Sequence, residues 1–562
     1  MTEEPTEPRA AVTPSAPVRA GTGGDGVAAN ASTDGSTHLK SIGVVSALTM
    51  VSRVLGLVRE RVTAGVFGTG ALISAFVTGY TFPNLFRRLL AEGGLTAALV
   101  PTLNHQLETN RREGAFRLIN QVTSWLLVVT GGVVVLSMIL FSQDDAIRFF
   151  GHLFKAEPDT LDRWLLAARY TVRLFPYLLF VSLAAAFSAA LQSLHRFLEP
   201  ALSPIWLNVS IIGLLLTATF VARGNPEMQV NWLTAGWLIG GFLQMAVPAL
   251  ALMNEGWRPR LDFEVTDSLR SMVRLMVPTL FSSSVYLINM STVRLIGLSL
   301  NDQAVSVLNY AQRLMELPIG VFAVAISTVV FPLISRYAAA GDTGNLASAY
   351  RKGMRLILVI NIPAAIGLGI LAKPIIRLIL QNGQFGQSDT SMMAPVLVAN
   401  ALGLPFLSFA GLALRAFYAQ RNTVIPVRAA ILSFLVNIGV SIALMNWLSF
   451  VGLAIASSVA AAAQAAYLQW HLTRKQEGLA FRYLVRDLGK VSIAAVLMGA
   501  VVGAGWWSWR QEVPSTFWYD ALGISVMIVT GVVVYCGLVW FLRVEGRDEF
   551  ATLWAKIRRR FV

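Results

Sequence analysis

The chain has 562 residues, of which 55% are hydrophobic and only 14% are charged. A soluble domain carries roughly 25% charged residues, so the composition excludes a soluble enzyme. The net charge of +14 would suggest a nucleic-acid partner in a soluble protein, but here it indicates how the chain is oriented in a membrane. The single cysteine, Cys536, excludes internal disulfides and cysteine-based metal sites, and the five histidines are too scattered to form a metal-ligand pair.

Residues 1–38 form the first segment and are rich in Pro, Thr, Ala, Gly and Ser. They show no apolar periodicity with which to pack, so we expect a disordered cytoplasmic tail. They do not resemble a signal peptide, because no charged start is followed directly by an apolar core.

Apolar runs about 20 residues long, enough to cross a hydrocarbon core about 30 Å thick, recur along the rest of the chain. They predict an all-α integral membrane protein with about fourteen spanning helices. In chain order, the predicted spans are 42–67, 71–100, 118–141, 164–194, 200–222, 231–253, 271–298, 304–334, 354–380, 391–419, 424–446, 450–472, 486–508 and 519–542.

The loops between these spans alternate in charge. The basic loops hold Arg111, Arg112, Arg117, Arg258, Arg260, Arg336, Arg351, Lys352, Arg421, Arg428, Arg474, Lys475, Arg482 and the tail from Arg543 to Arg560. The neutral or acidic loops include 68–70, 144–162, 301–302, 381–388 and 446–449. Because basic loops remain in the cytoplasm, this alternation places both termini there.

Two hairpins repeat each other at an offset of 229 residues, and internal repeats are common in transporters. The matches include Pro176 with Pro405, Phe180 with Phe409, and Asn208 with Asn437. We predict two pseudo-symmetric six-helix lobes, 39–260 and 261–475, then two further helices in 476–545 and a basic cytoplasmic tail, 546–562. The alternative is a chance similarity between two apolar hairpins.

Charged residues lie inside four of the spans, where an arginine at the bilayer centre costs roughly 2.5–3.5 kcal/mol or more. They are Arg53, Arg59, Glu60 and Arg61 in the first span, Arg87, Arg88 and Glu92 in the second, Arg294 in the seventh, and Arg313 and Glu316 in the eighth. Counting 1.5 Å per residue places four arginines more than about 10 Å from either surface, so we expect them to line a wet cavity. The four are Arg53, Arg59, Arg87 and Arg313. An excess of arginine over glutamate suits an anion, and guanidinium forks suit phosphate in particular.

Salt bridges within one helix are the alternative explanation for some of these charges. Arg88 and Glu92 are spaced i, i+4, and each can satisfy the other on one helix face. The same holds for Arg313 and Glu316, which are spaced i, i+3. Arg61 lies close to the outer end of its span, and for it we expect snorkelling to the membrane interface.

Two backbone breakers lie beside the charges. Gly56 stands between Arg53 and Arg59, and Pro83 precedes Arg87 by four residues. We predict bends at both positions, because proline removes a helical hydrogen bond and a helix that moves around a substrate has to bend.

Several segments of the chain resemble the MurJ (MviN) family, the lipid II flippases of bacterial cell-wall synthesis. The opening of that family is similar to SRVLGLVRERVTAGVFG (Ser52–Gly68) and AFVTGYTFPNLFRRLLAEGGLTAALVP (Ala75–Pro101). Later family segments are similar to YAQRLMELPIGVF (Tyr310–Phe322) and FYAQRNTVIPV (Phe417–Val427), and the resemblance covers about residues 40–545. It implies the fold of the multidrug/oligosaccharidyl-lipid/polysaccharide exporter superfamily, with two six-helix lobes around a central cavity and helices 13 and 14 shaping a groove for the lipid tail.

The resemblance also implies which residues act. Substrate-binding positions of the family's cavity match Arg53, Arg59, Arg87 and Arg313. Around them we expect supporting or gating residues, namely Glu60, Arg88, Glu92, Glu316, Gly56 and Pro83.

The chain departs from the family pattern at two places. Ser74 stands where many members have an acidic residue ahead of Ala75-Phe76. Helices 7, 11 and 12, where a sodium site has been proposed in some members, offer Asn437 and Ser441 but no carboxylate. A hard cation prefers carboxylate oxygen, so we do not expect sodium coupling.

We therefore expect a lipid II flippase and not an enzyme, with no cofactor, no metal and no catalytic residue. The head group would enter from the cytoplasmic side while the polyprenyl chain stays in lipid, and the arginines would hold the diphosphate as the lobes rock. We expect a monomer in the bacterial cytoplasmic membrane, in contact with membrane lipids and the cell-wall synthesis machinery.

Three other functions are alternatives. An exporter of another polyprenyl-linked oligosaccharide would use the same fold. A drug exporter usually handles cations, and a cationic cavity argues against that. A membrane enzyme acting on polyprenyl phosphates needs clustered aspartates for Mg²⁺, and the one Asp-Asp pair, Asp144-Asp145, is predicted in an outer loop.

Overall fold

The computed structural model describes residues 25–89, 95–153, 155–319, 324–514 and 516–545. Its α-helices, in chain order, are α1 (Asp25–Phe67), α2 (Ala71–Arg87), α3 (Leu95–Phe141), α4 (Asp144–Leu153), α5 (Pro158–Leu174), α6 (Pro176–Ser193), α7 (Leu198–Val221), α8 (Pro226–Asn254), α9 (Asp267–Leu300), α10 (Ala304–Pro318), α11 (Val324–Ala339), α12 (Thr343–Ile370), α13 (Ala372–Leu380), α14 (Gln387–Ala419), α15 (Val424–Lys475), α16 (Arg482–Glu512) and α17 (Phe517–Phe541). Within these ranges the one strand-like pairing is an isolated bridge between Asn382 and Phe385.

Nine helices in the described ranges are long and apolar enough to cross a membrane, namely α3, α6, α7, α8, α12, α14, α15, α16 and α17. Two of these are hairpins, because α3 leaves helical geometry at Arg111 (φ 54°) and α15 at Ser449 (φ 48°). The nine account for every predicted span except the first, second, seventh and eighth. Those four correspond to α1, α2, α9 and the α10–α11 pair, which carry the charges singled out above.

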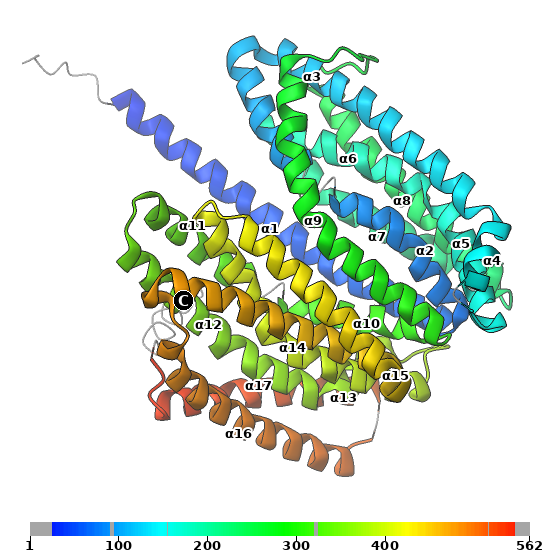
Figure 1. The fold of residues 1–562 in the computed structure, drawn as a ribbon, viewed down its shortest axis with the longest axis vertical. Coiled ribbons are helices and arrows are strands. Elements are labelled where there is room, and N and C mark those ends of the chain that lie inside the picture. The colour runs from blue at the N-terminus through cyan, green and yellow to red at the C-terminus, as the bar shows by residue number, and fades with distance from the viewer. Residues whose placement is uncertain (1–24, 90–94, 154, 320–323, 515, 546–562) are drawn as a thin grey trace, which may run out of the picture.

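The helices form two lobes (Figure 1). Helices α1–α8 make the N-terminal lobe and α9–α15 the C-terminal lobe, while α16 and α17 run along the side of α12 and α13. The first part of α9 lies against α3 of the N-terminal lobe, where the side chain of Gln106 donates to Ser268 Oγ at 2.7 Å. The lobes therefore contact each other through α9 as well as along α1, α2 and α10.

The packing of one lobe recurs in the other. Helix α1 packs on α7 as α9 packs on α15, α2 packs on α5 as α10 packs on α14, and α3 packs on α6 as α12 packs on α14. Asn208 and Asn437, matched at the repeat offset, make corresponding contacts. Asn208 accepts from Arg59 of α1 at 3.1 Å, and Asn437 donates to Asn289 of α9 at 2.9 Å. The predicted repeat is confirmed.

One local expectation differs from the structure. Helix α1 begins at Asp25, so residues 25–38 are helical, whereas 1–24 lie outside the described residues. All four prolines of the expected tail precede residue 25, which leaves the rest free to continue a helix. Gly56 and Pro83 both lie inside continuous helices, and the bends expected there stay a prediction.

The lobes close on each other at one end of the bundle, which we call the neutral end because loops 68–70 and 381–388 lie there. The backbone N–H of Gln384 donates to the carbonyl oxygen of Gly65 at 2.8 Å, joining the end of α1 to the α13–α14 turn. Gly383 has φ +52°, and a Cβ there would lie 2.2 Å from the Gly65 oxygen. This close approach requires glycine at position 383.

Ion pairs attach α16 and α17 to the C-terminal lobe at both ends. Asp487 of α16 accepts from Arg355 of α12 at 2.7 Å. Asp520 of α17, whose side chain is 5% exposed, pairs with Arg377 of α13 at 3.2 Å and with Arg510 of α16 at 3.3 Å. Helices α16 and α17 are therefore attached to the C-terminal lobe by buried ion pairs.

Candidate functional site

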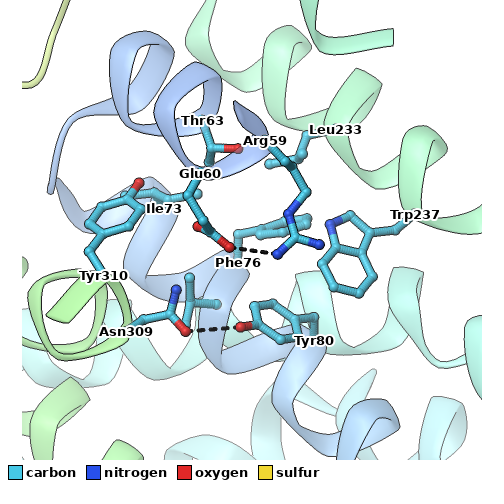
Figure 2. Close-up of a pocket in the computed structure, with 11 residues that line it drawn as sticks. Arg59, Glu60, Thr63, Ile73, Phe76, Tyr80, Leu233, Trp237, Asn309 and Tyr310 are labelled. Carbon is cyan, nitrogen blue, oxygen red and sulfur yellow. Dashed lines mark hydrogen bonds and ion pairs between the residues drawn. The ribbon is translucent and has the colours of Figure 1, made fainter. Parts of the chain in front are cut away.

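A small cavity with both polar and apolar lining lies between the lobes (Figure 2). It is lined by Arg59, Glu60, Thr63, Ile73, Phe76, Val77, Tyr80, Leu233, Trp237, Asn309 and Tyr310. Its volume is about 20 Å³, which is room for about one water molecule. The lobes are therefore closed at this site, and any larger ligand here needs them to separate.

Glu60 connects the two lobes inside this cavity. Its Oε1 lies 2.6 Å from Arg59 Nη2, on the same helix α1, and 3.5 Å from Arg313 Nε of α10. The side chain of Glu60 is only 10% exposed. One buried carboxylate is thus shared between an arginine of each lobe.

The two arginines are also held by further groups. Arg59 Nη1 donates to Asn208 Oδ1 at 3.1 Å, and its guanidinium stacks 5.5 Å from the ring centroid of Trp237. Arg313 Nη1 donates to Glu316 at 2.9 Å, so the ion pair expected from their i, i+3 spacing forms. Glu316 is 41% exposed, which makes this second pair far more solvated than the contact with Glu60.

A third arginine, Arg294 of α9, enters the same region. It donates to Thr81 Oγ1 and, at 3.3 Å, to Asn309 Oδ1, and its guanidinium lies 5.6 Å from the ring centroid of Tyr80. Tyr80 in turn donates to Asn309 Oδ1 at 2.9 Å, as the dashed line in Figure 2 marks. All of these partners are neutral, and Arg313 lies within electrostatic range of Arg294. The arrangement leaves positive charge uncompensated, which is suited to an oxyanion.

The remaining predicted site residues lie outside the cavity in this closed conformation. Arg53 is half-buried on α1 and makes no hydrogen bond or ion pair with the part of the chain that the structure describes. Arg87 donates to Asn84 Oδ1 at 2.7 Å, and the neighbouring Arg88 has a buried Nε without a partner. Glu92 lies outside the described residues.

Arg61 contacts the C-terminal end of α13. Its Nη1 donates to the carbonyl oxygens of Leu378 and Ile379 at 2.7 and 2.8 Å, and its guanidinium stacks on Phe517 at 5.3 Å. Carbonyls at a helix C-terminus lack partners within the helix and attract cations. The end of α13 therefore binds Arg61, and the expected snorkelling to the membrane interface stays a prediction.

Sequence reasoning counted Arg294 among the charges but left it out of the site, and it missed Tyr80 and Asn309 altogether. Their separation of 229 residues does not make them equivalent positions of the repeat, because α2 begins at Ala71 and α10 at Ala304. The two side chains meet between α2 and α10, at the interface of the lobes. Among the described residues, no group of three or more His, Cys, Asp or Glu side chains is placed to hold a metal ion.

The geometry is that of a closed, cation-rich cavity between two repeated lobes, and the family follows from comparison. A family model described as lipid II flippase MurJ matches residues 63–518. The chain belongs to this family. Its similarity extends to a probable lipid II flippase MurJ of Haemophilus influenzae, 31% identical, with 87% of this chain and 96% of the relative covered. A Vibrio cholerae relative with the same description is 30% identical, covering 91% of this chain and 97% of its own length.

Solved structures with the same fold include a lipid II flippase MurJ in an inward closed conformation. Its TM-score is 0.72 at 24% identity, and the match covers 89% of this chain and 98% of that one. An inward-facing multidrug transporter of the MATE family has a TM-score of 0.60 at 16% identity, with 78% and 98% covered. These likenesses confirm the predicted fold class, and the MurJ-family chain is a multi-pass membrane protein.

Proposed function

We propose that this MurJ-family protein moves lipid II, the polyprenyl-diphosphate-linked peptidoglycan precursor, from the cytoplasmic to the outer leaflet by alternating access. The observation that carries the proposal is the group of three arginines between the lobes, Arg59, Arg294 and Arg313. Two of them contact Glu60, the one buried carboxylate that the described residues place in this group. An anionic head group completes that charge balance. The proposal requires no bond to be made or broken, so no catalytic residue is assigned.

Three arginines hold the diphosphate in this proposal, namely Arg59, Arg294 and Arg313. Arg53 lies six residues before Arg59 on α1, about 9 Å along the helix, and Arg87 is at the last turn of α2. We expect Arg53 and Arg87 to contact the head group when the lobes part, before the diphosphate reaches the inner three. Arg88, Glu92 and Glu316 support these charges.

Orientation follows from charge. The basic loops lie in the cytoplasm, and the neutral end therefore faces outward with its Gly65–Gln384 contact closed. The head group enters from the basic end and passes between the lobes, 39–260 and 261–475. The polyprenyl chain lies in a groove shaped by 476–545. The tails 1–38 and 546–562 are cytoplasmic, and the protein acts as a monomer beside the cell-wall synthesis machinery of the bacterial cytoplasmic membrane.

Depletion of the protein in its host tests the proposal. We expect lipid II to accumulate in the cytoplasmic leaflet, measured by its accessibility to an enzyme or label added from outside. Accumulation of a different lipid-linked glycan would instead assign the exporter of another polyprenyl-linked oligosaccharide. Unchanged lipid II in both leaflets would contradict the proposed function.

A further inference from the structure

Glu60 is the one carboxylate among the residues that line the cavity. Arg59 approaches it from the N-terminal lobe and Arg313 from the C-terminal lobe, at 2.6 and 3.5 Å. A phosphate oxygen bound between the lobes would need the same two guanidinium groups. Glu60 thus occupies, in this conformation, the position in which substrate charge is expected.

The surrounding charges show why this carboxylate matters for closure. The side chains of Arg59 and Arg313 are only 11% and 24% exposed, so solvent screens their mutual repulsion weakly. Glu316 contacts Arg313 but not Arg59 among the described ion pairs, and it is 41% exposed. Without Glu60, closing the empty lobes would bury two facing arginines and no shared anion.

We propose that Glu60 substitutes for the substrate phosphate in the empty protein and so allows the lobes to close again after the substrate has left. This inference rests on the proposed function. The diphosphate displaces Glu60 from the two arginines when the substrate binds, and Glu60 returns when it departs. Glu60 is therefore a positioning residue for the return step and not a group that holds the substrate.

Exchange and net movement of lipid II should respond differently to the loss of Glu60. Exchange of one lipid II molecule for another needs only the loaded protein to change conformation, because substrate is bound in both directions. Net movement needs the empty protein to return as well. Loss of the carboxylate should therefore slow net movement and spare exchange, whereas a merely structural defect would reduce both.

The experiment uses full-length protein in liposomes with fluorescently labelled lipid II in one leaflet. Net movement is measured with no lipid II in the opposite leaflet, and exchange with unlabelled lipid II there. For Glu60→Gln we expect exchange within twofold of wild type and net movement slowed at least tenfold. Glu199→Gln is the matched control, because Glu199 is 12% exposed and paired with Arg196 away from the cavity. It should leave both rates unchanged.

A second variant keeps the test decisive if Glu60→Gln folds poorly. Glu60→Asp retains the carboxylate on a shorter side chain, and we expect it to keep exchange and to recover part of the net movement. Equal loss of exchange and net movement in Glu60→Gln, or net movement in Glu60→Asp as slow as in Glu60→Gln, would overturn the inference. Failure of the wild-type protein to move lipid II in either assay would contradict the proposed function itself.

Discussion

Single arginines in this protein differ in what surrounds them, and their substitutions should differ accordingly. Arg59 and Arg313 share Glu60, so removal of either arginine leaves that carboxylate with a partner. Glu316 is partly solvated and tolerates the loss of Arg313. Alanine at either position therefore removes a substrate contact without stranding a buried charge.

We expect Arg59→Ala and Arg313→Ala to reach the membrane at normal levels and to flip lipid II slowly. Hydrogen bonds to charged groups are worth about 1.5–3 kcal/mol, so each loss should reduce the rate at limiting substrate by about 10- to 150-fold. Lysine should restore only part of this, because it keeps the charge but loses the two-pronged geometry. Growth complementation at matched expression measures the effect, and normal growth of the alanine variants would refute the assigned roles.

Arg294→Gln is the corresponding test for the residue that sequence reasoning left out. Its partners Thr81 and Asn309 are neutral, so the substitution should lower flipping by a similar factor while the protein remains folded. The transport rate in liposomes and the thermal midpoint, measured on the same preparation, distinguish a role in transport from a purely structural role. A lower midpoint with an unchanged rate would show that Arg294 serves only to join α9 to α2 and α10.

Arg61→Ala should act through stability instead. Arg61 satisfies two half-buried carbonyls at the end of α13, and a net contribution of about 0.5–1.5 kcal/mol per hydrogen bond is lost with it. We expect a lower thermal midpoint of the purified protein and a normal transport rate per folded molecule. A midpoint equal to that of wild type would mean that this arginine is free to reach the interface.

At the scale of elements, the contact between the end of α1 and the α13–α14 turn determines how well the neutral end closes. Gly383→Ala places a Cβ 2.2 Å from the Gly65 oxygen in a left-handed backbone conformation. The strain should exceed about 1 kcal/mol and favour an opened neutral end.

Accessibility of a single cysteine at the neutral end, in a Cys536→Ser background, measures this opening. Gly411→Ala in α14 is the control, because nothing lies within 4 Å of the position where its Cβ would stand. It should be neutral or slightly stabilising. Equal accessibility in both alanine variants would show that the turn closes without the glycine contact.

For the whole molecule, orientation is tested by labelling from each side of the membrane. Ser142 and Lys475 are both exposed and lie in loops of opposite charge type. Cysteine at Ser142 should react with a reagent added outside the cell, and cysteine at Lys475 only after the membrane is made permeable. Labelling of both from the same side would contradict the predicted alternation of spans.

Energy coupling is also a property of the whole molecule. Asn437, Ser441 and Asn289 form a hydrogen-bonded polar group without a carboxylate, which is a poor sodium site. We expect transport in liposomes to continue without sodium and to respond to membrane potential, since moving one charge through 100 mV is worth about 2.3 kcal/mol. A strict sodium requirement at clamped potential would contradict this.

Much of the architecture could be predicted because its signals are local or periodic. Apolar runs identified the spans, and the offset between Asn208 and Asn437 identified the lobes. The meeting of Arg294 with Thr81 could not be predicted, because no local pattern encodes which faces of two helices 213 residues apart come together. Gly383 likewise resembles any loop glycine until the Gly65 carbonyl is placed beside it.

Helix α13 is joined on two sides, and the two attachments are unequal. On one side it receives Arg61 of α1 through backbone carbonyls, and on the other its Arg377 pairs with the buried Asp520 of α17. The chain leaves regular helix at Leu371, between α12 and α13. When the neutral end opens, α13 has to release α1 while its ion pair keeps it on α17. We therefore expect the opening of the neutral end to turn α13 at Leu371 and to move α17 together with it.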